Sequence, residues 1–233
     1  MSDKYKDNDF IHCYPGTDVL INKLGIRKSK ELFRVERELV SFRLAELNDK
    51  PIKGSFDLEH LKKIHAYLFQ DVYEWAGKVR NYNISKPGTM FCISDYILPY
   101  AASIFSKLHD EHFYIDYDYD TKLLKLVTIF SDINALHPFR EGNGRTQRVF
   151  IEWLAKIAGI SLDLTSVTKV EMALASFDGM RGKYDHLFEI FKEHSHSISR
   201  SVQLANIQRL LADKDKKLIV GLLDKAPQKK IKM

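Results

Sequence analysis

The sequence predicts an all-α domain that carries one short β-hairpin. Apolar residues recur at helical spacing over most of the 233 residues. One stretch, residues 79–93, differs because it holds two short β-prone runs around the turn pair Pro87-Gly88. Hydrophobic residues make up 45% and charged residues 29%, the balance of a globular chain, which excludes a disordered or collagen-like protein.

The N-terminal third contains a lead-in and two helices. Residues 1–16 are polar and contain Pro15-Gly16, so we expect an extended segment. Apolar spacing then predicts a helix over residues 29–47, which Pro51 and Gly54 separate from the next one. Asp57 is placed to cap that second helix, whose apolar face runs over residues 58–75.

The rest of the chain is read as the hairpin followed by helices. The runs 79–84 and 89–93 form the expected hairpin, and helical spacing resumes over 95–113. A strongly apolar pattern over 123–136 predicts a helix at the centre of the core, and another follows over 149–157. Further helices are expected near 168–177, 184–194 and 198–213.

Charge and composition limit the class of partner and the compartment. The net charge of +5 suits an acidic partner, but no helix-turn-helix or basic stripe stands out, so direct nucleic-acid binding is not expected. The longest apolar run, residues 218–223, is far shorter than the roughly 20 residues of a membrane span. The N-terminus has no apolar signal-peptide core, and Cys13 and Cys92 are the only cysteines. We therefore expect a cytoplasmic protein without membrane association.

One segment of twelve residues, His137-Pro-Phe-Arg-Glu-Gly-Asn-Gly-Arg-Thr-Gln-Arg148, carries the candidate chemistry. Pro138 disfavours helix at the residue before it, which leaves the His137 imidazole at a helix end facing a loop. Gly142 and Gly144 allow a ligand to approach the backbone closely. The loop amides and the first free N–H groups of the following helix form a cradle for an anion.

The charged members of this segment refine the prediction. Arg145 and Arg148 are three residues apart on a helix, so they share one face and fit a di- or triphosphate. Glu141 would repel phosphate unless it holds Mg²⁺, which bridges phosphate oxygens. Each residue alone has a structural reading, and a kinase-type P-loop is absent from the chain. Their contiguity predicts a nucleotide-phosphate site with His137 as the base.

The same segment resembles the signature of the Fic family, H-P-F-x-[D/E]-G-N-G-R-x-x-R, at every fixed position. Residues 57–84 also look like the helix and flap region of that family. The resemblance covers roughly residues 12–195. We therefore expect three parts, namely a lead-in over 1–16, a Fic domain over 17–195, and a C-terminal helix with a basic tail over 196–233.

The resemblance implies a Fic fold, a helical bundle with a β-hairpin flap over the active site. It also implies transfer of AMP from ATP to a Tyr, Thr or Ser hydroxyl of a target protein, with release of pyrophosphate. Under that resemblance His137 is the base that deprotonates the hydroxyl, and Glu141 holds Mg²⁺. Arg145 and Arg148 hold the β- and γ-phosphates, and Phe139 packs inward to anchor the loop.

The remaining roles implied by the resemblance concern the α-phosphate and the target. Asn143 and the amides around Gly142 and Gly144 hold the α-phosphate. The flap, about residues 80–93, holds the target chain by strand addition. Lys86 contacts the nucleotide or the target, although a solvated lysine in a turn is an equal reading.

Regulation and alternative reactions stay open at this point. Many family members carry an inhibitory helix with the pattern [S/T]-x-x-x-E-[G/N], and this chain has no full match. The nearest, Ser55 to Glu59, is followed by His60. This suggests a bacterial toxin or effector that is silenced by a separate small antitoxin protein, in the bacterial cytoplasm or delivered into a host cell. Alternatives are transfer of UMP, phosphocholine or phosphate, removal of AMP, or a non-catalytic binding module.

Overall fold

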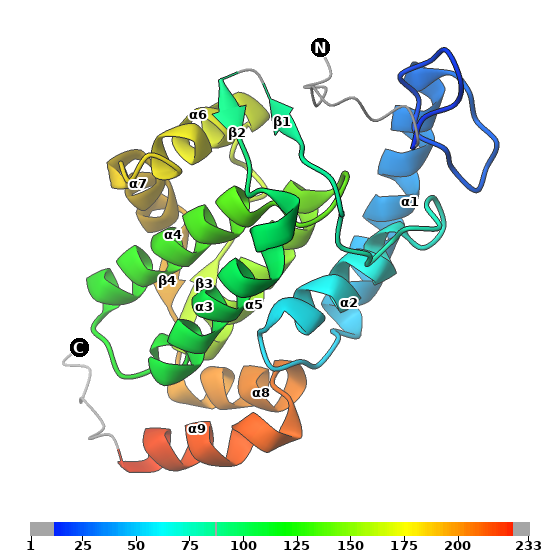
Figure 1. Cartoon of the computed structure of the whole chain (residues 1–233). Helices are drawn as coiled ribbons and strands as arrows, with labels where there is room; N and C mark the ends of the chain where they lie inside the picture. Colours follow the sequence, from blue (N-terminus) through cyan, green and yellow to red (C-terminus); the bar gives the residue numbers. More distant parts are fainter. Residues whose placement is uncertain (1–11, 87, 226–233) are drawn as a thin grey trace.

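A computed structural model describes residues 12–86 and 88–225 of the chain, and the structural statements below concern these residues. Most of the lead-in, Pro87 of the hairpin turn and most of the basic tail lie outside them. The helices of this part are α1 (Ser29–Asp49), α2 (Leu58–Phe69), α3 (Ile97–Asp110), α4 (Tyr119–Leu136), α5 (Asn143–Ala158), α6 (Lys169–Gly179), α7 (Asp185–Glu193), α8 (Arg200–Leu210) and α9 (Asp213–Lys225). Two small two-stranded sheets accompany them, and the all-α prediction is confirmed (Figure 1).

Helix α5 lies at the centre of the bundle, where it packs against α2, α4 and α8 (Figure 1). Its consecutive side chains Val149, Phe150 and Ile151 are buried and lie about 100° apart around the helix axis, so three faces of the helix contribute to one core. Truncating a buried phenylalanine such as Phe150 to alanine costs about 3–5 kcal/mol. The helix at the centre of the core therefore carries, in its first turns, the second half of the twelve-residue segment.

Polar side chains begin the helices that flank the site. Asp57 accepts a hydrogen bond from the His60 amide at the start of α2, as the sequence predicted. Asp118 accepts one from the Thr121 amide and begins α4. These caps satisfy amides that have no partner inside their own helix, and so they fix where α2 and α4 start.

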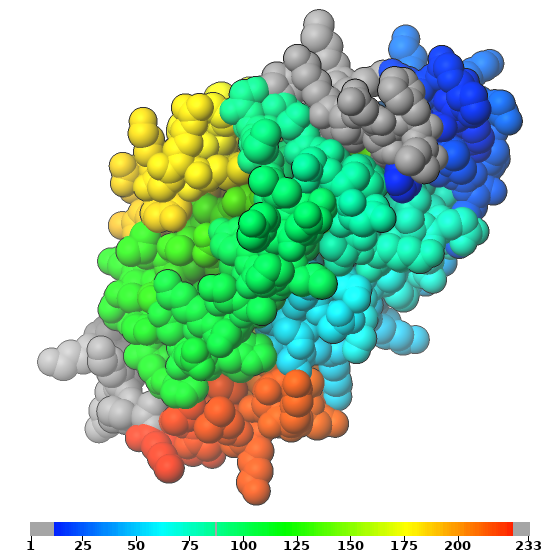
Figure 2. Space-filling model, in the orientation of Figure 1, coloured from blue at the N-terminus to red at the C-terminus, as the bar shows by residue number. Residues whose placement is uncertain are grey.

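The predicted hairpin is present but shorter than expected. Its strands are β1 (Ser85–Lys86) and β2 (Thr89–Met90), which pair antiparallel. The expected strand over 79–84 is wrong because this segment is attached to the loop after α4. The Arg80 amide donates to the Pro138 carbonyl over 2.9 Å instead of pairing with a strand. Figure 2 shows the hairpin region on the molecular surface beside α6, coloured yellow.

The C-terminal part contains elements that the sequence did not predict. Strand β3 (Ile160–Leu162) pairs antiparallel with β4 (Ser195–Ser197), and both are too short for periodicity to reveal them. The helix expected near 198–213 is interrupted at Leu211 and continues as α9. The break occurs where Ala212 donates to the Gly54 carbonyl over 2.9 Å.

Residues beyond 195 pack onto the helical core. Gln203 on α8 donates to the Ile157 carbonyl of α5 over 2.8 Å, and Ile207 is fully buried. The apolar run 218–223 forms part of α9, where Ile219 is buried. Strand β4 crosses the expected division at residue 196, and that division stays a prediction. None of the described helices is long and apolar enough to cross a membrane.

Candidate active site

His137 ends α4 in a left-handed conformation, with φ of 43° and ψ of 59°. Its Nδ1 lies 3.0 Å from the carbonyl oxygen of Asn134. Because a carbonyl can only accept, Nδ1 must carry the proton, and the lone pair of the neutral ring then lies on Nε2. Backbone geometry at the helix end therefore presents the tautomer that a general base requires.

The environment of His137 keeps its imidazole neutral. The side chain is buried, and its ring stacks on Phe91 with ring centres 3.7 Å apart. Burial lowers the pKa of His137 to about 3, and the positive charges of Lys86 and Arg80 act in the same direction. The structure thus brings Lys86 of the hairpin close enough to His137 to affect its charge state.

Hydrogen bonds between Asn143 and Phe139 hold the loop in its folded shape. The Asn143 side chain accepts from the Phe139 amide over 2.9 Å and donates to the Phe139 carbonyl over 2.7 Å. Phe139 is buried, and its ring stacks on His65 at 3.9 Å. The structure engages the Asn143 amide within the loop, so its expected contact with an α-phosphate stays a prediction.

His65 is a site residue that the sequence analysis missed. Its Nδ1 accepts from the Gly77 amide over 2.8 Å, so its Nε2 carries the proton and donates to the Glu141 carbonyl over 2.9 Å. Burial lowers its pKa to about 3. The sequence feature that could have identified it is a histidine beside Ile64 and Leu68 on the apolar face of α2, because a buried polar side chain needs hydrogen-bond partners.

Gly142 and Gly144 have different physical requirements. Gly142 has φ of +81°, and a Cβ there would lie 2.3 Å from Cζ of Phe69. Only glycine fits both its conformation and this close approach. Gly144 lies in the first turn of α5 and is exposed, and a Cβ there would meet nothing within 4 Å. The first amides of α5 have no acceptor in a preceding turn and are available to an anion.

Glu141 is the carboxylate of the cradle. Its Oε1 accepts from the Gly142 amide over 2.8 Å and lies 3.7 Å from Nη2 of Arg145. The described residues contain no cluster of three or more histidines, cysteines or carboxylates placed to hold a metal. A single half-exposed carboxylate beside the N-terminus of α5 still fits Mg²⁺, because that ion binds through one or two carboxylates, substrate phosphates and water.

The two arginines of the segment have unequal surroundings. Nη2 of Arg145 lies 2.6 Å from Oε1 of Glu36 on α1, and its guanidinium lies over the Phe69 ring at 4.6 Å. Arg148 makes no ion pair within 4 Å among the described residues, and its Nε donates to the Gly144 carbonyl over 3.3 Å. Burial lowers the pKa of Arg148, and the charge of Glu152 opposes this only in part, whereas Glu36 contacts Arg145 directly.

Arg80 joins the hairpin to the loop that carries His137, a role that is not readable from its place at the flap boundary in the sequence. The side chain is buried and donates to the carbonyls of His137 over 2.8 Å, Tyr82 over 2.7 Å and Cys92 over 2.5 Å. One guanidinium thus satisfies backbone acceptors on both sides of the site. Its many donors suit this task better than the single ammonium of a lysine.

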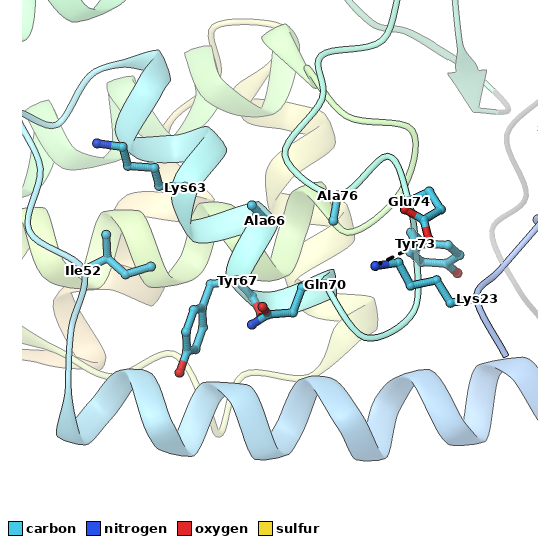
Figure 3. A pocket seen from close by; sticks show the side chains of 9 residues that line it. All are labelled: Lys23, Ile52, Lys63, Ala66, Tyr67, Gln70, Tyr73, Glu74 and Ala76. Atoms are coloured by element: carbon cyan, nitrogen blue, oxygen red, sulfur yellow. Dashed lines mark hydrogen bonds and ion pairs between the residues drawn. The ribbon is translucent and has the colours of Figure 1, made fainter.

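A cavity of about 430 Å³ lies elsewhere, along α2 and the segment that follows it (Figure 3). None of the predicted site residues lines it. Its wall includes Lys23, Lys63 and Tyr73, and Figure 3 shows the ion pair between Lys23 and Glu74 at its edge. The candidate active site is therefore the open cradle at the N-terminus of α5 and not this cavity.

The fold and the site together define a helical domain with a glycine-containing loop at a helix N-terminus and a neutral, buried histidine beside it. The chain belongs to the Fic/DOC family, whose model matches residues 55–155. It is 33% identical over 193 residues to the protein of Escherichia coli strain K12 named "Probable protein adenylyltransferase Fic". The matched region is 83% of this chain and 96% of that protein. The expected family is confirmed.

A second relative extends well beyond this chain. "Protein adenylyltransferase VbhT" of Bartonella schoenbuchensis is 38% identical over 204 residues, which are 87% of this chain. The matched region is 43% of VbhT, so this chain spans less than half the length of that relative.

Solved structures confirm the fold. The BepC effector of Bartonella tribocorum with bound AMPPNP has a TM-score of 0.74 at 25% identity, and covers 81% of this chain and 97% of its own. The N-terminal Fic domain of an effector from Bartonella sp. AR 15-3 has a TM-score of 0.76 at 29% identity, and covers 79% of this chain and 91% of its own. The expected Fic fold with its hairpin is thus confirmed.

Proposed function

We propose that this chain is a protein adenylyltransferase that transfers AMP from ATP to a hydroxyl side chain of a target protein and releases pyrophosphate. The observation that carries the proposal is the complete segment from His137 to Arg148, in which the His137 tautomer leaves the lone pair on Nε2. Relatives at 33–38% identity are named protein adenylyltransferases, and a structural relative binds AMPPNP, which supports this reaction.

The proposed reaction assigns a step to each part of the loop. His137 Nε2 takes the proton of the target hydroxyl while the hydroxyl oxygen attacks the α-phosphorus. The bond from that phosphorus to the α–β bridging oxygen breaks, and pyrophosphate leaves with the electron pair. The amides around Gly142 and Gly144 hold the α-phosphate, and Arg145 and Arg148 hold the β- and γ-phosphates.

Two further groups complete the proposed nucleotide site. Glu141 is the residue that would hold Mg²⁺, which neutralises phosphate charge when bound. Asn143 keeps the loop in shape through both of its bonds to Phe139 and contacts the α-phosphate from there. Lys86, near His137, faces the nucleotide or the target hydroxyl.

The hairpin is the proposed docking edge for the target. The sheet has only two strands, so strand β2 (Thr89–Met90) has an outer edge along which an extended chain could add, which is the strand-addition mode of peptide recognition. Met90 on β2 is 75% exposed, and so offers an apolar contact to a bound chain. Arg80 connects this edge to His137, so a chain bound along the hairpin lies next to the base.

The reaction is tested with ATP labelled at either the α- or the γ-phosphate, incubated with the protein and a cell lysate. We expect label on a target band from the α position only. Label from the γ position only would mean phosphate transfer and would refute nucleotidyl transfer.

The base is tested with His137→Ala. Because a base acts on the target hydroxyl, we expect transfer to fall by about 10²–10⁴-fold while the ATP dissociation constant, measured by calorimetry, stays within a few-fold. Unchanged transfer would refute the role of His137.

Control by a separate small antitoxin is part of the proposal. An antitoxin glutamate that pairs with Arg148 would compete directly with a phosphate for the guanidinium. The lack of a full inhibitory pattern in the chain supports this, and the translocated Bartonella effectors among its structural relatives support delivery into a host cell. We expect the chain to be toxic when expressed alone. Harmless expression of a protein that is active in vitro would refute this part.

A further inference from the structure

Glu36 on α1 is a buried carboxylate 109 residues away in sequence from its partner in the active-site loop, and it lies outside the region that the family model matches. Only 7% of the residue is exposed. Its Oε1 accepts from Nη2 of Arg145 over 2.6 Å, and its Oε2 accepts from the hydroxyl of Tyr73. Because both oxygens have donors, the carboxylate is held in one orientation.

Arg145 is fixed by this carboxylate and by the ring beneath it. The guanidinium carbon lies 4.6 Å from the centre of the Phe69 ring, and Oε1 of Glu141 lies 3.7 Å from Nη2. A guanidinium has five N–H donors in one plane. Fixing one nitrogen with Glu36 and one face with Phe69 sets the direction of the remaining donors.

Tyr73 completes the arrangement from the segment after α2. Its ring is buried, stacks on Trp75 with centres 4.3 Å apart, and lines the cavity along α2 (Figure 3). Burial raises the pKa of Tyr73, and the negative charge of Glu36 acts in the same direction, so its hydroxyl stays protonated and donates. The tyrosine thus holds the carboxylate, and the carboxylate holds the arginine.

We propose that Glu36, supported by Tyr73, is a positioning residue that orients Arg145 toward the phosphates of the nucleotide. The inference rests on the proposed function, since it assumes that Arg145 binds phosphate. It makes α1 part of the nucleotide site. Two physical effects of Glu36 oppose each other, because its hydrogen bond orients Arg145 while its negative charge repels phosphate. The proposal states that orientation is the larger effect.

Glu36→Ala and Glu36→Gln separate these two effects. Glutamine keeps the shape and an acceptor for Arg145 but removes the charge, whereas alanine removes both. We expect alanine to weaken ATP binding about tenfold, the scale of one charge-assisted hydrogen bond, and glutamine to stay within about threefold of wild type. The readout is the ATP dissociation constant measured by calorimetry, at a temperature where circular dichroism shows each variant folded.

Glu38 offers a matched control on the same helix. Its side chain is 60% exposed and pairs with Arg34 at the surface. We expect Glu38→Ala and Glu38→Gln to leave ATP binding unchanged. If Glu36→Ala and Glu36→Gln both bind ATP more tightly, or if Glu36→Ala behaves like Glu38→Ala, the proposal is overturned.

A double-mutant cycle tests whether Glu36 acts through Arg145. In an Arg145→Ala background, Glu36→Ala should change ATP affinity less than about twofold, because the group that it orients is gone. A tenfold effect that persists in that background overturns the proposal. Tyr73→Phe is the second test if Glu36→Ala fails to fold. We expect it to weaken ATP binding when Arg145 is present and to leave ATP binding unchanged in the Arg145→Ala background. An equal effect of Tyr73→Phe in both backgrounds would overturn the proposal. A wild-type chain that binds no ATP would overturn the proposed function itself and this inference with it.

Discussion

Acid should destabilise this protein well above the pH at which its carboxylates titrate, because three buried histidines resist protonation. Burial lowers the pKa of His60 to about 4 and those of His65 and His137 to about 3. In the unfolded chain each histidine takes up a proton near pH 6.5. Below that pH the unfolded state therefore binds three more protons than the folded state, and the free energy of unfolding falls as the pH falls.

The size of the effect follows from these pKa values. Between pH 7 and pH 5, each histidine lowers the free energy of unfolding by about 2 kcal/mol, or about 6 kcal/mol together. Glu152 opposes this loss, because burial raises its pKa to about 7. Between pH 7 and pH 5 the folded chain binds a proton on Glu152 that the unfolded chain largely lacks, and this offsets about 2 kcal/mol of the loss. The net loss is about 4 kcal/mol, a large share of the 5–15 kcal/mol of a typical domain.

Urea unfolding followed by circular dichroism at pH 7 and pH 5 measures this loss. In His137→Ala it should shrink to about 2 kcal/mol, because one of the three histidines is gone. His186 is exposed on α7, so His186→Ala should leave the difference at its wild-type size. Equal stability of the wild type at the two pH values, or an undiminished difference in His137→Ala, would refute the reasoning.

Three further predictions concern the loop. Gly142→Ala should lower the free energy of unfolding in urea by about 2–5 kcal/mol, because of the positive φ at this position and the clash with Phe69. Gly144→Ala should change it by less than about 0.5 kcal/mol, because a Cβ there meets nothing within 4 Å. Equal effects of the two substitutions would contradict this. Arg80→Lys should lower kcat about tenfold with ATP affinity unchanged, since one ammonium cannot reach three carbonyls; an unaltered initial rate would be the contrary result. The rate of transfer should stay flat from pH 8 to pH 6, since the pKa of His137 is lowered to about 3, and a midpoint near pH 6.5 would show that the base is not this buried ring.

The parts of the fold that sequence predicted are those with long, strongly periodic patterns. The core helix over 123–136 and the Asp57 cap depend on local spacing and local hydrogen bonds, and both are confirmed. Strands β3 and β4 pair residues more than 30 positions apart over three residues each, so no local pattern indicates them. The segment 79–84 misled the prediction because its β-prone residues serve a tertiary attachment to Pro138 instead of a strand.

The candidate site shows the same division between local and distant information. The twelve-residue segment is contiguous, so its residue types and spacing were readable, including the helix end at His137. His65, Arg80 and Glu36 come from other elements and act on the segment through one or two hydrogen bonds each. Their types are common on helices and loops, and only the folded arrangement identifies them as partners of the loop.

The unequal environments of the two arginines change the charge balance expected at the nucleotide. With Arg145 paired to Glu36 at 2.6 Å, its positive charge is largely compensated before any ligand binds. Arg148 has no such partner within 4 Å among the described residues, and Glu152, whose burial raises its pKa to about 7, compensates the charge of Arg148 only in part. A guanidinium whose charge is compensated contributes mainly oriented hydrogen bonds, whereas a less compensated one contributes net attraction to phosphate.

Neutralising Arg148 should therefore make ATP binding less sensitive to salt than neutralising Arg145 does. In contrast, Arg145→Lys should weaken ATP binding more than Arg148→Lys, because it removes a positioned fork of donors. Titrations of both pairs of variants at low and high salt would test this division, and equal salt dependence in Arg145→Gln and Arg148→Gln would contradict it.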